Sequence, residues 1–312
     1  MKTKALSRRS FILSTTVISA GIFNFSKSTL SSFEPFNRKG KSRLLPSLAA
    51  YSFRDYFIYG GSKKPLPQEK RIDLFQFIDF CAQNGCVGTE LTSYYFPPDV
   101  NEDYLLKIKR HAFLNGIAIS GTSVGNSFTL PSGDARKREI EKVKKWIDYA
   151  AIMGAPHIRV FAGSAGNLPV QEAKKYCIEA LNECGDYAGK KGVFLGIENH
   201  GGIVAEPEPL IEIVNAVKSD WIGINLDTGN FVTEDPYKDI EKCAPYAVNV
   251  QIKVEVRRKN QKQAEPADLE RVFNILKKAN YQGFVALEYE AAEDPWAAVP
   301  RYLKEVARLC SV

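Results

Sequence analysis

The chain has 312 residues, of which 45% are hydrophobic and 25% are charged. This composition is typical of a globular protein long enough to bury a full core, and it excludes a collagen, a coiled coil and a disordered chain. The formal net charge is +6, but residues 1–32 hold five basic side chains and no acidic one, so the other 280 residues carry only +1. That balance offers no basic face to a nucleic-acid partner.

The N-terminus has the pattern of an export signal. Ser7-Arg8-Arg9-Ser10-Phe11 precedes an uncharged stretch that is too short and too rich in Ser and Thr to form a stable membrane span. We expect residues 1–32 to be a twin-arginine signal peptide and residues 33–45 to be a linker. The mature protein is then expected in the periplasm.

Short strand-like runs alternate with longer amphipathic stretches from residue 46 onward. The runs, rich in β-branched or aromatic residues, predict strands over 48–52, 87–91, 117–122, 157–161, 193–198, 222–227, 248–253 and 284–288. Between them apolar residues recur three and four apart, which predicts helices, for example over 139–153 and 171–190. Glycines at helix ends support these boundaries; they are Gly85, Gly116, Gly192 and Gly283.

Eight strand–helix units predict an α/β fold, a (β/α)8 TIM barrel, with residues 46–312 as one catalytic domain. A doubly wound open sheet is the alternative, but no G-x-G-x-x-G follows the first strand. The six cysteines show neither a C-x-x-C motif nor metal-ligand spacing. They indicate buried thiols, with a Cys81–Cys86 disulfide left open.

Four predicted strands carry an acidic residue as their last residue or the one before it, and a TIM barrel gathers these strand ends at one rim. The acids are Glu90, Glu198, Asp227 and Glu288. Ionised carboxylates facing one cavity repel one another and are costly to bury without compensation. A divalent ion held by Glu198, Asp227, Gln251 and Glu288, from four consecutive strands, is the simplest compensation. Because all four ligands are oxygens, we expect Mn²⁺ or Mg²⁺ as the cofactor.

Further polar residues near these strand ends are predicted to bind substrate: Glu90, Arg159, His200 and Lys253. Alternation along the seventh strand directs Asn249, Gln251 and Lys253 toward the barrel interior. Structural alternatives stay open for three of these residues. Glu90 could pair with Arg54 or Arg159, His200 could bond to the backbone, and Lys253 could serve only as a counterion. The other two histidines, His111 and His157, are expected to be structural.

Four segments resemble the sugar phosphate isomerase/epimerase family, the xylose isomerase-like TIM barrels. They are LGIENH at 195–200, NLDTGN at 225–230, QIK at 251–253 and ALEY at 286–289, and the resemblance covers nearly all of residues 47–310. It implies a divalent ion held by Glu, Asp, His and Glu from the fifth to the eighth strand. Glu198, Asp227 and Glu288 match this set, whereas Gln251 stands where the family usually has His.

The resemblance implies proton abstraction next to a carbonyl, through an enediolate, with Glu198 and Glu288 as the catalytic pair. The expected protein is an exported, divalent-metal-dependent isomerase or epimerase of a small, non-phosphorylated carbohydrate. One alternative uses the same enediolate to expel a β-substituent, as a lyase, a dehydratase or an enzyme that cleaves keto-glycosides. An alternative of another class is a non-catalytic periplasmic sugar-binding protein.

Overall fold

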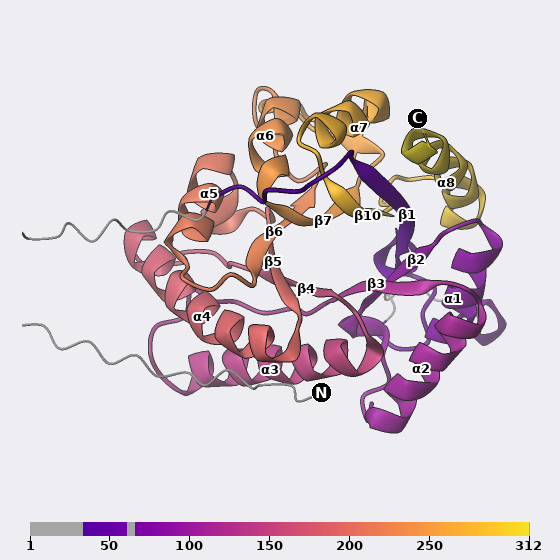
Figure 1. Cartoon of the computed structure of the whole chain (residues 1–312), viewed down its shortest axis with the longest axis horizontal. Coiled ribbons are helices and arrows are strands. Elements are labelled where there is room, and N and C mark those ends of the chain that lie inside the picture. The colour runs from indigo at the N-terminus through magenta and orange to yellow at the C-terminus, as the bar shows by residue number, and fades with distance from the viewer. Residues whose placement is uncertain (1–33, 61–65, 312) are drawn as a thin grey trace, which may run out of the picture. The chain divides into compact units, whose positions relative to one another are not determined.

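The protein is a closed barrel of eight parallel strands surrounded by helices (Figure 1). The structure, a computed structural model, describes residues 34–60 and 66–311. The strands, in barrel order, are β1 (Arg43–Ala49), β10 (Gln282–Leu287), β7 (Ala247–Ile252), β6 (Ile222–Asp227), β5 (Phe194–Glu198), β4 (His157–Phe161), β3 (Ala118–Ser123) and β2 (Gly88–Thr92). The predicted (β/α)8 TIM barrel is confirmed. The predicted signal peptide, residues 1–32, lies outside the described residues.

A helix follows each barrel strand. These helices are α1 (Leu74–Gln83), α2 (Glu102–Leu114), α3 (Asp134–Met153), α4 (Val170–Lys191), α5 (Pro207–Ala216), α6 (Pro236–Cys243), α7 (Leu269–Lys278) and α8 (Pro295–Ser311). A capping box begins α1, where Asp73 accepts from the amide of Gln76 and the Gln76 side chain accepts from the amide of Asp73. Among the described helices, none combines the length and the apolar character that a membrane crossing needs.

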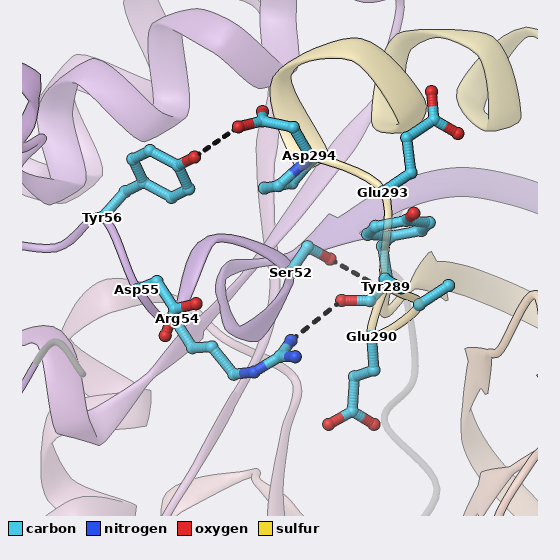
Figure 2. A pocket seen from close by; sticks show the side chains of 11 residues that line it. Ser52, Arg54, Asp55, Tyr56, Tyr289, Glu290, Glu293 and Asp294 are labelled. Atoms are coloured by element: carbon cyan, nitrogen blue, oxygen red, sulfur yellow. Dashed lines mark hydrogen bonds between the residues drawn. The ribbon is translucent and has the colours of Figure 1, made fainter. Parts of the chain in front are cut away.

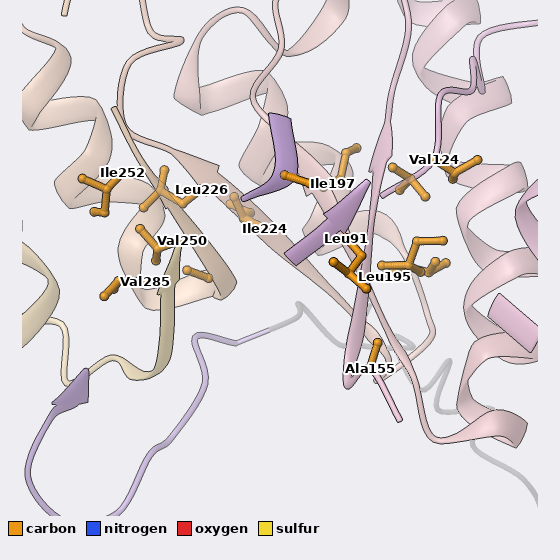
Figure 3. Close-up of a cluster of buried hydrophobic side chains, with 14 of the residues drawn as sticks. Leu91, Val124, Ala155, Leu195, Ile197, Ile224, Leu226, Val250, Ile252 and Val285 are labelled. Atoms are coloured by element: carbon orange, nitrogen blue, oxygen red, sulfur yellow. The ribbon is translucent and has the colours of Figure 1, made fainter. Parts of the chain in front are cut away.

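Aliphatic side chains fill the space between the strands and the helices. Figure 3 shows part of this core, in which Leu195, Ile197, Ile224 and Val250 have no exposed surface. Because side chains alternate along a strand, Leu195 and Ile197 on one face leave Glu198 for the opposite face of β5. The packing of the outer layer therefore fixes which polar residues enter the barrel.

Strand β1 begins earlier than the sequence predicts. It covers Arg43–Ala49 rather than 48–52, so it includes the last three residues of the predicted linker. Upstream of it, the amide of Phe36 donates to the carbonyl of Pro245 over 3.1 Å, and the Arg38 guanidinium lies 5.1 Å from the ring centre of Tyr281. The sequence pattern does not predict this early start, because Pro46 lies within the strand and proline is uncommon inside strands.

Two smaller features also differ from the prediction. Gly283 lies within β10, and the left-handed residue after α7 is Asn280, with φ +53°. An antiparallel pair of two-residue strands follows β7, formed by β8 (Glu255–Val256) and β9 (Glu265–Pro266). The cysteines behave as expected for thiols: all six lie in the described chain, none forms a disulfide, and five are buried.

Candidate functional site

The strand ends bring the predicted acids together inside one end of the barrel. Glu90 and Asp227 have no exposed surface, and Glu198, Gln251 and Glu288 are exposed by 6% or less. Glu90 lies on β2, Glu198 on β5, Asp227 on β6 and Gln251 on β7, and Glu288 directly follows β10. The predicted catalytic pair, the predicted ligands and Glu90 therefore belong to one buried cluster, as the alternation of the strands indicates.

Glu198 is held by three neighbours. Its Oε2 lies 2.9 Å from Nε of Arg159, and its Oε1 lies 2.9 Å from Nδ1 of His200. Asn230 also donates to Oε1 over 2.9 Å. Burial acts to raise the pKa of Glu198, but Arg159 and His200 outweigh it and hold that pKa below its ordinary value. Glu198 is thus an ionised carboxylate, and its hydrogen bond raises the pKa of His200.

Lys253 joins the other acids of the cluster. Its Nζ lies 2.6 Å from Oε2 of Glu288 and 3.4 Å from Oδ2 of Asp227, and it also contacts Glu290. Burial acts to lower the pKa of Lys253, but the three carboxylates raise it well above its ordinary value. Lys253 is therefore a buried cation that pairs with these acids, and its predicted role in substrate binding stays a prediction.

Asp227 is fixed mainly through its backbone. Asn199 accepts from the amide of Asp227 over 2.8 Å and donates to its carbonyl over 2.9 Å. Oδ1 of Asp227 accepts from the amide of Gly229, while Oδ2 is buried without a hydrogen-bond partner among the described residues. Burial raises the pKa of Asp227 to about 8, although Lys253 opposes the rise. Asp227 is the least satisfied acid of the site.

Amide side chains form a closed network on Glu90. Glu90 accepts from Nδ2 of Asn249 over 2.8 Å and from Nε2 of Gln251 over 2.7 Å. Asn249 also donates to Oδ1 of Asn225, whose Nδ2 donates to Oε1 of Gln251 over 2.7 Å. The nitrogen of Gln251 also faces Oε1 of Glu288 at 3.4 Å. Burial raises the pKa of Glu90 to about 7. Glu90 has no exposed surface, so its side chain does not line a cavity that a substrate could enter.

Cavities open around the mouth of this cluster. One of about 330 Å³ lies between the residues after β1 and the loop before α8 (Figure 2), where Tyr56 donates to Asp294 over 2.6 Å. Arg54 donates to the carbonyl of Tyr289 on the same wall. Another, of about 440 Å³, is lined by His200, Asn230 and Arg257 among others. Both volumes fall within the range of small-molecule sites.

Most of the chain matches one known protein family. Residues 78–306 match the family described as Xylose isomerase-like TIM barrel. The chain belongs to this family. An inosose dehydratase of Histophilus somni (strain 129Pt) is 23% identical over 297 residues, which cover 80% of this chain and 95% of that protein.

Solved structures share the fold of this xylose isomerase-like chain. A xylose isomerase-like TIM barrel protein from Mycobacterium smegmatis in complex with magnesium aligns with a TM-score of 0.66 at 16% identity, over 86% of this chain and 97% of that one. A D-psicose 3-epimerase in the presence of D-fructose aligns with a TM-score of 0.64 at 14% identity, over 86% of this chain and 94% of that one. At these identities the similarity shows a common fold.

The side chains of this family member do not fit the four-ligand ion that the resemblance implies. Their chemistry suits a hard ion, because Glu198, Asp227 and Glu288 offer carboxylate oxygens. Their arrangement does not, because the oxygen of Gln251 accepts from another amide and Lys253 lies against two of the acids. Within 34–60 and 66–311, no group of three or more His, Cys, Asp or Glu residues is placed to hold a metal ion.

Residues that the sequence analysis did not assign to the site also contribute to it, among them Asn199, Asn225, Asn230 and Glu290. Asn225 and Asn230 stand at the two ends of the NLDTGN segment. Glu290 follows Glu288 by two residues and therefore shares its side of the chain. The NLDTGN segment and the spacing of Glu290 from Glu288 could have indicated the last three of these residues, but only the fold shows which partner each side chain contacts.

Proposed function

We propose that this protein is an isomerase or epimerase that removes a proton next to the carbonyl of a carbohydrate and returns it. The observation that carries the proposal is the pair Glu198 and Glu288 in one buried cluster, each fixed by a different cation. One carboxylate takes the proton from carbon and becomes a carboxylic acid, and the other, protonated from solvent beforehand, gives its proton to the enediolate. His200 bonds to Glu198 while 58% of its side chain is exposed, so it links this carboxylate to solvent.

The proposed substrate is a small, non-phosphorylated carbohydrate. The predicted substrate-binding cations Arg159 and Lys253 are paired with acids of the cluster, which leaves neither of them for a phosphate group. The twin-arginine pattern supports the same substrate class, because an exported enzyme meets free sugars and glycans. Export to the periplasm is part of this proposal.

A divalent ion, Mn²⁺ or Mg²⁺, is the cofactor that the family implies, and the relative from Mycobacterium smegmatis was solved with magnesium. Such an ion would polarise the carbonyl of the substrate. Because the side chains do not fit it as placed, the proposed proton transfer rests on Glu198, Glu288 and His200 alone.

A lyase is the second candidate, and the similarity to an inosose dehydratase favours it. The same enediolate would then expel a β-substituent, which leaves with the electron pair of its bond to carbon. The two reactions differ in product mass: an epimer has the mass of the substrate, whereas elimination releases a fragment or water.

Replacement of each acid tests the proposal. Glu198→Gln and Glu288→Gln cannot accept a proton, so we expect a loss of turnover of about 10²-fold or more on ketoses and keto-glycosides, with circular dichroism showing a retained barrel. Glu270→Gln is the matched control, because Glu270 forms an exposed ion pair with Arg308 on the outer helices. Normal turnover by either of the first two variants would contradict the assignment.

A further inference from the structure

The cluster contains a buried cation on a rigid support. We propose that Lys253 fills the cation position of this site, so that the protein binds no divalent ion there, and that Gln251 acts as a hydrogen-bond donor rather than as a metal ligand. The inference concerns the site of the proposed function. It is tested by measuring metal binding, which does not require that the protein turns over a substrate.

The position of Lys253 is fixed along its whole length. Its backbone amide donates to Oγ1 of Thr228 over 2.9 Å. A Cβ on Gly229 would lie 2.6 Å from Cγ of Lys253 and 2.7 Å from its Cβ, so the lysine stem packs directly on that glycine. The ammonium group at its end meets Glu288, Asp227 and Glu290. A divalent ion shared by Asp227 and Glu288 would have to displace this group or lie against a like charge.

The orientation of Gln251 is fixed by its three partners. Its nitrogen faces Glu90 and Glu288, and its oxygen accepts from Asn225. Turning the amide over would set its oxygen against two carboxylates and its nitrogen against the NH₂ group of Asn225. Asn225 cannot turn in response, because its own oxygen accepts from Asn249. The oxygen of Gln251 is therefore directed away from the acids that would share an ion with it.

Side-chain cations already lie against three acids of the cluster. Glu198 is paired with Arg159, which is itself buried and donates to the carbonyl of Val124. Asp227 and Glu288 share Lys253. These two cations reduce the repulsion between carboxylates for which a metal ion was the simplest compensation in the sequence.

Metal content of the purified full chain tests this inference. After equilibration with Mn²⁺ and removal of excess ion, mass spectrometry of the metals should find well under one Mn²⁺ per chain, and added Mn²⁺ should not raise the Tm. The double variant Gln251→His with Lys253→Met supplies an imidazole and removes the cation. It should retain about one Mn²⁺ per chain and gain thermal stability when Mn²⁺ is added.

Lys278→Met is the matched control, because it removes a lysine that pairs with Glu241 on the exposed surface, and it should bind no more Mn²⁺ than the unmodified protein. A full equivalent of Mn²⁺ on the unmodified protein, with a rise in Tm, would overturn the inference without need of any variant. That result would leave the proposed proton transfer standing. Absent turnover in a metal-free protein would count against the proposed function alone.

Discussion

Two buried glutamates of this protein have different pKa values because their hydrogen-bond and charge partners differ. Glu198 and Glu90 both lie within barrel strands and both are buried. Glu198 forms an ion pair with a guanidinium and has a lowered pKa, whereas Glu90 accepts its hydrogen bonds from two neutral amides, and burial raises its pKa to about 7. The sequence predicted both acids in one cluster but not their states, because the partner Asn249 is 159 residues away from Glu90.

His157 provides a pH test at the scale of one residue. Burial lowers its pKa from 6.5 to about 4, and the charged groups that face it are Glu90 on β2 and Arg159 on its own strand. A depressed pKa in the folded state means that the stability from neutral His157 is present above pH 6.5 and is lost as the pH falls toward 4. Between pH 7 and pH 5 the free energy of unfolding should fall by about 2 kcal/mol more in the unmodified protein than in His157→Gln.

Urea unfolding at the two pH values measures this difference. Carboxylates distant from His157 titrate alike in both proteins, so the comparison removes their contribution. Equal losses of unfolding free energy in the two proteins would show that His157 does not resist protonation.

At the scale of elements, periodicity located the helices and strands well, and it failed where a strand depends on distant contacts. The helices predicted over 139–153 and 171–190 are α3 and α4, each longer by a few residues. The predicted position of β1 was wrong because Pro46 interrupts the strand pattern. The register of β1 comes from pairing with β10 at the other end of the chain, which the local sequence does not show. The two-residue strands β8 and β9 are too short for any periodic signal.

The end of α4 gives a test at this scale. Gly192 follows the helix with φ +71°, and a Cβ there would meet nothing within 4 Å. Only the left-handed backbone therefore opposes a side chain. We expect Gly192→Ala to lower the free energy of unfolding by about 1 kcal/mol and Gly192→Asn to lower it by less, since Asn tolerates this conformation better. Thermal or urea unfolding of the three proteins measures it, and equal losses from Ala and Asn would contradict the backbone explanation.

For the whole molecule, the repeated strand–helix units were enough to predict the barrel, and the barrel was enough to predict where the acids meet. What the sequence could not show is which cation pairs with which acid. The network that orients Gln251 spans β2, β6 and β7, and its geometry exists only when the barrel is closed. The sequence alone therefore could not show that Lys253 lies against Asp227 and Glu288.

Exchange of substrate hydrogen with solvent tests the central claim, proton abstraction next to a carbonyl, most directly. The protein, Glu288→Gln and Glu270→Gln would each be incubated in D₂O with free ketoses, a phosphorylated ketose and keto-glycosides, followed by mass spectrometry and NMR. Deuterium is expected next to the carbonyl of a non-phosphorylated sugar with the unmodified protein and with Glu270→Gln, and none with Glu288→Gln. Deuterium uptake that persists in Glu288→Gln, or no uptake from any sugar although one of them binds, would contradict this claim.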